Sequence, residues 1–249
     1  MTALPEGYRH LALGDVGSTN DEALLRARSG ETGNLWITAE RQSTGKARRG
    51  RSWVSELGNL YSSLLLIDPA PTPKLGTLPL VAALAVYRTL RPFFHRVPQT
   101  LTIKWPNDLL VDGAKINGIL LESGHLADGR LAVVIGCGIN CAHHPESTLY
   151  QTTDLKSCGI DIAPQALLEA LAAEMDATLA LWARGAGLPA IREAWLMAAQ
   201  GVGEAVRVNL GDKTLEGVFV DLDPDGYLLL QDDKAVLHRV SAGDLFFTA

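Results

Sequence analysis

The sequence predicts an α+β fold, with a mixed or antiparallel sheet, flanking helices and a small β unit at the C-terminus. Two Asp-Gly pairs, at 112–113 and 128–129, each have apolar runs on both sides, which indicates hairpins and therefore antiparallel strands. The long helical periodicities are grouped at 77–94 and 164–199 and do not alternate regularly with strands. After Gly201 the pattern changes to short alternating runs, which predicts a second unit built from strands.

The first predicted elements lie before residue 70. Residues 20–29 begin with capping residues, carry acidic residues in the first turn and stop at Gly30, which predicts a short helix. Residues 35–40 and 59–67 are typical of strands. The second strand is apolar almost throughout, so we expect it to be buried on both faces.

A longer helix and a strand follow. Alanine, leucine and valine recur at helical spacing over 77–94, and we expect this helix to end in the Arg91-Pro92 region because proline disrupts a helix. Residues 101–105 predict the next strand.

The last third of the chain predicts two helices and then strands. Pro164 begins a helix that we expect to end at about residue 184, and a second helix is expected from about residue 189 to 199. Beyond residue 200, turn signals at Gly211-Asp212 and Asp225-Gly226 separate short runs and predict a small barrel-like β unit. We therefore expect two domains, 1–200 and 201–249.

The composition is that of an ordinary globular protein. Of 249 residues, 47% are hydrophobic and 20% are charged, and the net charge is −6. The N-terminus lacks the basic start and apolar run of a signal peptide, and no stretch approaches the roughly 20 apolar residues of a membrane helix. We expect a cytoplasmic protein that contacts no membrane.

The cysteines predict neither a disulfide framework nor a metal centre. Cys137, Cys141 and Cys158 make an odd count without a CxxC pair. Cys141 with His143 and His144 offers a metal cluster as an alternative, but a zinc site normally shows a fuller ligand set at tighter spacing. We expect no tightly bound protein metal.

The most distinctive segment is a basic loop at residues 41–53. It carries five cationic side chains in a protein of negative net charge, namely Arg41, Lys46, Arg48, Arg49 and Arg51. A basic island in an acidic protein favours a small anionic ligand such as a nucleotide. A solvated basic turn that touches nucleic acid is the alternative that this segment alone leaves open.

Known phosphate-binding and hydrolase patterns do not account for the basic loop or for the glycine-rich strand. A P-loop requires glycine at position 40 and a hydroxyl residue at 47, where the chain has Glu40 and Ala47. The segment from Gly136 to Cys141 begins like a dinucleotide fingerprint but lacks its third glycine and the helix that should follow. No G-x-S-x-G motif of a serine hydrolase is present.

Ordered motifs resemble those of the biotin protein ligase family. They are Ser18-Thr19-Asn20, Gln42 to Trp53, Lys104-Trp-Pro-Asn-Asp108, Lys115 to Glu122 and Gly136 to Asn140. KWPND followed seven residues later by Lys-x-x-Gly-Ile-Leu is a specific signal. The resemblance implies a class II synthetase-like catalytic domain of the biotin/lipoate ligase type and an SH3-like C-terminal barrel.

This resemblance implies a reaction and its partners. The family activates biotin with Mg-ATP as biotinoyl-5′-AMP, releases diphosphate, and transfers biotin to one lysine of a biotin carboxyl carrier protein, such as the subunit of acetyl-CoA carboxylase. A lipoate ligase and a non-catalytic biotin-binding module are the alternatives. Some members carry an N-terminal DNA-binding domain; because the first motif begins at Ser18, we expect neither that domain nor a DNA partner. Members often form homodimers.

The resemblance also implies roles for individual residues. Catalysis is expected of Lys115, Arg48 and Lys46, whose charges would offset the repulsion between the biotin carboxylate and the α-phosphate. Biotin or adenylate binding is expected of Ser18, Thr19, Asn20, Gln42, Gly45, Lys46, Ala47, Arg48, Lys115, Gly118 and Gly136. ATP binding is expected of Arg49, Arg51, Trp53, Lys104, Asn107, Asp108 and Asn140, and Asp108 is also the candidate ligand for the Mg²⁺ of ATP.

Two expectations concern the biotin end and the loop. Ser18, Thr19 and Asn20 are expected to donate hydrogen bonds to the ureido ring and Gln42 to accept one, although the three could also cap the helix at 20–29. The usual family loop reads GRGRRG, whereas this chain has Lys46-Ala47 in place of the first Arg-Gly. Lysine loses the bidentate pairing of arginine, so we expect looser retention of the adenylate.

Overall fold

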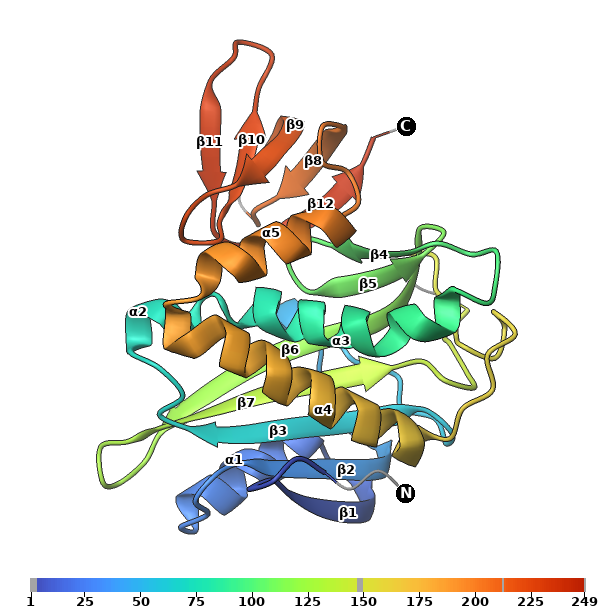
Figure 1. Ribbon diagram of the computed structural model, residues 1–249, viewed down its shortest axis with the longest axis vertical. Helices are drawn as coiled ribbons and strands as arrows, with labels where there is room; N and C mark the ends of the chain where they lie inside the picture. Colours follow the sequence, from blue (N-terminus) through green and yellow to red (C-terminus); the bar gives the residue numbers. More distant parts are fainter. Residues whose placement is uncertain (1–3, 147–149, 212, 249) are drawn as a thin grey trace.

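A computed structural model describes residues 4–146, 150–211 and 213–248 of the chain. Its main sheet has seven strands in the order β1-β2-β3-β7-β6-β5-β4 (Figure 1). Only the β1–β2 pair is parallel, so the predicted mixed, largely antiparallel sheet is confirmed. The strands are β1 (Arg9–Val16), β2 (Leu35–Gln42), β3 (Leu60–Ile67), β4 (Leu101–Lys104), β5 (Asp108–Val111), β6 (Ala114–His125) and β7 (Leu131–Ile139).

Both Asp-Gly pairs form the hairpins that the sequence predicts, and β3 is buried on both faces along almost its whole length. Strand β1 was not predicted. It lies at the edge of the sheet, so its residues are only partly buried, and Gly14 and Asp15 weaken its strand pattern. Its pairing with β2 comes from tertiary context and not from local propensity.

The longer helices follow the sequence pattern closely, whereas the short α2 was not predicted. They are α1 (Thr19–Arg28), α2 (Thr72–Leu75), α3 (Leu78–Phe94), α4 (Pro164–Trp182) and α5 (Leu188–Ala198). Helix α3 passes through Pro92 and ends two residues later, at Phe94. A proline so near the end costs little helix, because few residues follow that depend on the interrupted hydrogen bonds. Within the described residues no helix is long and apolar enough to cross a membrane.

Strand β7 lies between two hydrophobic cores, and its successive side chains point alternately into one and the other. Val133, Ile135 and Cys137 point into the larger core, which α3, α4 and α5 help to build, while Ala132 and Val134 point into a smaller core with α1. Figure 1 shows α3 and α4 lying together across one face of the sheet. Further along β7, residues 136 and 138 continue the α1 face as glycines. A side of the sheet that is packed at one end is therefore left open at the other.

The C-terminal unit is an antiparallel sheet in the order β11-β10-β9-β8-β12. Its strands are β8 (Ala205–Asn209), β9 (Thr214–Leu222), β10 (Leu228–Gln231), β11 (Leu237–Val240) and β12 (Asp244–Phe247). Of the two turn signals, Asp225-Gly226 lies in the β9–β10 connection, while Asp212 lies outside the described residues.

The predicted barrel is wrong, because this sheet stays open. In the described part of the chain β11 and β12 remain its two edges, and closure would need hydrogen bonds between them. Apolar side chains of the sheet, including Phe219 and Leu230, join the larger core of the main body, and β9 contacts α5. The apolar face is thus covered by the main body of the chain, and the sheet does not have to close on itself.

Candidate active site

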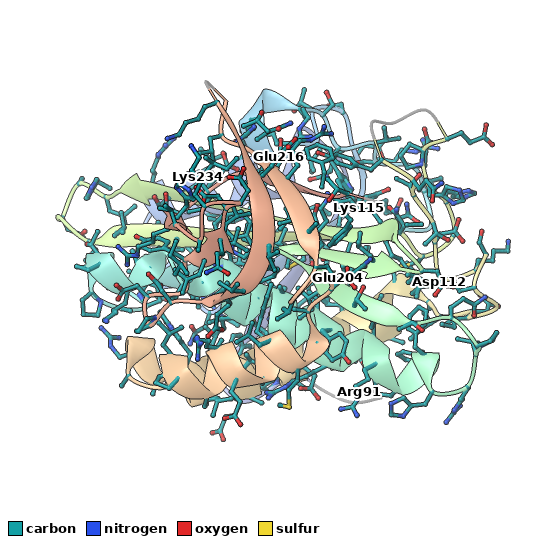
Figure 2. All side chains as sticks on the ribbon, turned by 90° about the horizontal axis from the view of Figure 1, so that it is seen from above. Arg91, Asp112, Lys115, Glu204, Glu216 and Lys234 are labelled. Carbon is teal, nitrogen blue, oxygen red and sulfur yellow. The ribbon has the colours of Figure 1, made fainter. Side chains whose placement is uncertain are left out.

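A cavity lies between the α1 face of the main sheet, the basic loop and the C-terminal unit. Most of the residues that the sequence singled out line it: Ser18, Thr19, Asn20, Gln42, Lys46, Ala47, Arg48, Arg51, Trp53, Lys104, Asp108, Lys115, Gly118, Gly136 and Asn140. Gly45, Arg49 and Asn107 are not among its described lining residues. In Figure 2 Lys115 is seen beside the strands of the C-terminal unit, and Gly243 to Leu245 of that unit line the same cavity.

Glycines form the floor of the cavity. Gly118 on β6 and Gly138 on β7 are direct cross-strand partners. A Cβ atom added to Gly118 would lie 2.8 Å from the Trp53 ring, and one added to Gly138 would lie 2.6 Å from it. The indole therefore lies against bare backbone, which explains why both positions are glycine. Sequence reasoning missed Gly138, although its alternation with Gly136 was a usable signal.

A β-bulge brings Lys115 into the cavity. Leu109 pairs with Asn117 but Leu110 pairs with Lys115, so Ile116 is the extra residue of β6. Lys115 and Gly118 are three residues apart and would face opposite sides of a regular strand. Because of the bulge both face the cavity, while Ile116 is packed into the larger core.

The backbone and side chain of Lys115 are both held. Its N–H donates to Gln151 O at 2.7 Å, and its carbonyl accepts from Thr153 N–H at 3.0 Å. Its Nζ lies 2.7 Å from Asp108 Oδ2 and 5.5 Å from the centre of the Trp53 ring. The cation is thus fixed between a carboxylate and an aromatic face, at the edge of the glycine floor.

The Ser-Thr-Asn segment is buried at the start of α1. Ser18 holds the N-cap position with extended backbone, but its hydroxyl does not cap the helix. Ser18 is only 3% exposed and lines the cavity, so its hydroxyl is available to a ligand. Thr19 N–H instead donates to Gln42 Oε1 at 2.9 Å, which satisfies one of the free N–H groups of the first turn. The simple capping alternative does not describe this segment.

Arg48 crosses from the basic loop to the C-terminal unit. Its guanidinium donates to Asn107 Oδ1 at 3.0 Å and to Gly243 O at 2.9 Å. Burial lowers the pKa of this guanidinium, an effect that the nearby carboxylates of Asp108 and Asp244 oppose. Asn107 donates in turn to Ile119 O, so it supports Arg48 and not the cavity wall.

One carboxylate of the C-terminal unit binds two arginines of the basic loop. Asp244 Oδ2 accepts from Arg49 and Asp244 Oδ1 accepts from Arg51, each at 3.1 Å. Arg49 also donates to Asn209 O at 2.9 Å. Sequence reasoning missed Asp244 because it follows the loop by more than 190 residues and carries no local signal.

Two lysines at the cavity are bound in different ways. Lys46 Nζ lies 2.5 Å from Asp21 and 3.7 Å from Glu122, and the Asp21 hydrogen bond raises the pKa of Lys46. Lys104 is 8% exposed and lies 4.4 Å from the centre of the Tyr150 ring, and its burial lowers its pKa. Lys46 is therefore on the α1 side of the cavity, whereas Lys104 is on the side of the C-terminal unit.

The loop after β7 holds the residues that could have suggested a metal cluster. His144 Nδ1 is 2.5 Å from Asp154 Oδ2, and Cys141 is buried with its pKa raised to about 12 by burial. Among the residues described, no group of three or more His, Cys, Asp or Glu could hold a metal ion. Asn140 lines the cavity and donates to Thr153 O at 3.0 Å.

Asp244→Asn is expected to loosen the basic loop. Asparagine keeps the size of the side chain but removes the charge that binds Arg49 and Arg51, while Arg48 keeps its bond to Gly243 O. We expect trypsin to cleave the loop several-fold faster in the ligand-free variant, as measured by mass spectrometry of timed digests.

The matched control is Asp225→Asn, which makes the same change in the same unit at a residue paired with Arg239. Its loop should be cleaved at the wild-type rate. Equal cleavage of the Asp244 variant and the wild type would contradict a holding role for this carboxylate.

The chain is similar to biotin ligases in sequence. The profile of the Biotin/lipoate A/B protein ligase family matches residues 15–140, and that of the Biotin protein ligase C terminal domain matches residues 201–248. A biotin–[acetyl-CoA-carboxylase] ligase of Paracoccus denitrificans is 34% identical over 94% of this chain and 99% of the relative. One of Mycobacterium tuberculosis is 32% identical over 96% and 89%.

Solved structures agree with the sequence comparison. The biotin protein ligase from Aquifex aeolicus in complex with biotin and ATP is similar with a TM-score of 0.81 and 25% identity. The match covers 96% of this chain and 99% of that one. The bifunctional ligase/repressor BirA of Escherichia coli is 33% identical, and the match covers 89% of this chain and 68% of that protein.

Proposed function

The chain belongs to the biotin/lipoate A/B protein ligase family, and from this membership we propose that it activates biotin as biotinoyl-5′-AMP and passes it to a carrier protein. It is a biotin ligase, with biotin and ATP as its substrates. The observation that carries the proposed mechanism is the β-bulge that turns Lys115 onto the glycine floor of the cavity. The division into domains at 1–200 and 201–249 is part of the proposal, and the C-terminal family match supports it.

The first step joins two anions. A carboxylate oxygen of biotin attacks the α-phosphorus of ATP, the bond between the α- and β-phosphates breaks, and pyrophosphate leaves. Two unit charges about 4 Å apart repel by roughly 4 kcal/mol at an effective dielectric constant near 20. We assign Lys115 and Arg48 to this repulsion, because both line the cavity and both are fixed by hydrogen bonds before a ligand arrives.

Lys46 is given a secondary part in this step. Its ammonium is already paired with Asp21 and Glu122, so it would have to leave them to reach the phosphate. Arg51, Trp53, Lys104 and Asn140 line the cavity and are proposed to contact ATP, with Arg49 holding the loop through Asp244.

The ureido ring of biotin is proposed to bind at the start of α1. Ser18 offers a buried hydroxyl that no helix cap uses, and Gln42 offers an amide oxygen beside Thr19. A buried ureido group without partners would cost about 1 to 3 kcal/mol per unpaired group, so these polar residues are needed there. The apolar part of biotin would lie against Trp53, whose ring covers Gly118 and Gly138.

Mg²⁺ is proposed to enter with ATP. Mg²⁺ in nucleotide sites is commonly held by one or two carboxylates and the substrate phosphates, and Asp108 is a carboxylate at the cavity wall. When bound there, the ion would neutralise phosphate charge.

The second step and its partner are also proposals. The amine of a carrier lysine attacks the biotinoyl carbonyl, AMP leaves with the bonding electrons, and an amide forms. The names of the relatives support the carrier subunit of acetyl-CoA carboxylase as the acceptor. We propose that this happens in the cytoplasm, since Cys137, Cys141 and Cys158 are free buried thiols.

A labelling experiment tests the function. The protein is incubated with Mg-ATP and a purified biotin carboxyl carrier domain, with either biotin or lipoate, and the carrier is analysed by intact-protein and peptide mass spectrometry. We expect one biotinoyl group on one carrier lysine and no lipoyl adduct. Absence of the biotin adduct, or equal labelling by lipoate, would overturn the proposal.

The Lys46→Arg/Ala47→Gly double variant is expected to hold biotinoyl-AMP longer. Arginine can keep its contact with Asp21 and also bind a phosphate with two N–H groups, so release should be about fivefold slower. Stopped-flow or dialysis measurement of adenylate release checks this, with Lys213→Arg as a matched change outside the cavity. Equal release rates for the double variant and the wild type would contradict the expectation that Lys46-Ala47 loosens retention of the adenylate.

A further inference from the structure

A chain of hydrogen bonds runs behind the Ser-Thr-Asn segment. Ser63 on β3 is fully buried, and its Oγ lies 2.7 Å from Thr19 Oγ1 and 2.6 Å from Asn20 Oδ1. Asn20 Nδ2 lies 2.8 Å from Glu122 Oε2 on β6. Ser63 and Glu122 are not among the described residues that line the cavity, so any effect they have on a ligand passes through Thr19 and Asn20.

The number of hydrogens fixes the direction of each bond. An ionised carboxylate only accepts, so the NH₂ group of Asn20 faces Glu122 and its Oδ1 faces Ser63. An amide oxygen also only accepts, so the single hydroxyl hydrogen of Ser63 goes to Asn20. Toward Thr19, Ser63 can then act only as an acceptor. The hydroxyl hydrogen of Thr19 could point to Ser63 Oγ at 2.7 Å or to Gln42 Oε1 at 3.1 Å, and because two oxygens repel more strongly at the shorter distance without a hydrogen between them, it is directed at Ser63, into the protein.

Gln42 is oriented from the other side. Its Nε2 donates to Ser55 Oγ at 3.1 Å, and the Ser55 hydroxyl donates to Trp53 O at 3.1 Å. Its Oε1 accepts the N–H of Thr19 at 2.9 Å. Thr19 Oγ1 and Gln42 Oε1 are thus 3.1 Å apart with no hydrogen left to place between them. Two acceptors meet at the cavity wall, and a donor from a ligand would satisfy both.

We infer that Ser63 and Glu122 are positioning residues that hold the Thr19 hydroxyl as an acceptor, so that Thr19 and Gln42 together receive an N–H group of the ligand. The inference rests on the proposed function, in which that N–H belongs to the cyclic urea of biotin. The hydroxyl of Ser18, which caps no helix, is left to donate to the adjacent carbonyl. This revises the expectation from sequence, in which Thr19 and Asn20 were both donors. It also favours a cyclic urea over a ring without N–H groups, such as the dithiolane of lipoate, which would leave both acceptors without a donor.

The test is biotin binding by isothermal titration calorimetry, together with biotin-dependent pyrophosphate exchange. Ser63→Ala frees the Thr19 hydrogen to turn to Gln42, so we expect the Kd and KM for biotin to rise about tenfold. The KM for ATP and kcat should change by less than about twofold, since neither depends on the direction of this hydrogen bond. Ser63→Ala is checked for folding by circular dichroism.

Two substitutions of Glu122 separate hydrogen-bond direction from charge. Glu122→Gln still offers an oxygen to Asn20, whereas Glu122→Met offers none, and both remove the charge near Lys46. We expect Glu122→Met to weaken biotin binding about tenfold and Glu122→Gln to restore it to within about twofold of wild type. The double variant Ser63→Ala/Glu122→Met should bind biotin no more weakly than the single variant with the higher Kd, because both changes break the same chain of hydrogen bonds.

Each outcome decides the inference. Equal losses for Glu122→Gln and Glu122→Met, or an unchanged biotin Kd in a folded Ser63→Ala protein, would overturn it. If Ser63→Ala does not fold, the Glu122 pair gives the same decision. Wild-type protein that binds biotin but shows no biotin-dependent exchange would refute the proposed activation step, while the calorimetric comparison would still decide the role of Ser63 and Glu122.

Discussion

Lys115→Ala is expected to lower the rate of biotin-dependent pyrophosphate exchange by about 10²- to 10³-fold, the loss typical when one fixed group that stabilises transition-state charge is removed. The rest of the site should stay in place, because the backbone of Lys115 is held by Gln151 O and Thr153 N–H and not by its side chain. Biotin binding by calorimetry should change little. Initial exchange rates with radiolabelled pyrophosphate measure the effect.

Two further variants make this result specific. Lys234→Ala removes a lysine that is exposed in the C-terminal unit, as Figure 2 shows, and that does not line the cavity; it should exchange at the wild-type rate. Lys115→Arg keeps the charge, but the longer planar group cannot keep the position of Nζ between Asp108 and Trp53, so it should recover only part of the activity. Exchange within about threefold of wild type in Lys115→Ala would remove it from the catalytic step.

Arg48→Ala is expected to reduce the same exchange by about 10²-fold and to raise the KM for ATP. The substitution removes a half-buried cation from the cavity and also leaves Asn107 Oδ1 and Gly243 O without their donor. An unpaired buried acceptor costs about 1 to 3 kcal/mol, so the melting temperature should fall as well. Exchange kinetics and a thermal melt measure the two effects separately.

Arg41→Ala is the matched control for Arg48. Arg41 is exposed at the start of the basic loop and is not among the described residues that line the cavity. Removing it takes away the same charge from the same loop without breaking a contact to the C-terminal unit. If both variants lost activity equally, the exchange rate would depend on the net charge of the loop and not on the contacts of Arg48 with Asn107 and Gly243.

Local sequence signals predicted much of the fold because turns and helix starts depend mainly on the conformational preferences of the residues within them. The Asp-Gly pairs at 112–113 and 128–129 mark turns that few other residues can make, and both are hairpin turns in the structure. Prolines at 164 and 189 lie in the first turns of α4 and α5. By contrast, β1 and the open C-terminal sheet depend on what packs beside them. The residues within these two segments do not indicate which part of the chain packs against them.

The candidate site divides in the same way. Residue types and spacing predicted which side chains belong together, and Ser18, Arg48 and Lys115 do line one cavity. They did not predict partners that are distant in sequence, such as Asp244 for the loop arginines. They also did not predict hydrogen-bond direction. Whether Thr19 donates or accepts depends on Ser63, a residue that alone looks like any small side chain in a buried strand.

The extra residue in β6 makes the hairpin of β5 and β6 more sensitive to length than to composition. Ile116 occupies the larger core, so another apolar side chain of similar size could replace it with a modest loss of packing. Inserting one residue between Leu109 and Leu110 of β5 would give Ile116 a partner, restore the regular alternation of β6 and turn Lys115 to the opposite side of the sheet from Gly118. Such a one-residue insertion would take the proposed catalytic cation out of the cavity while leaving every letter of KWPND and Lys-x-x-Gly-Ile-Leu in place.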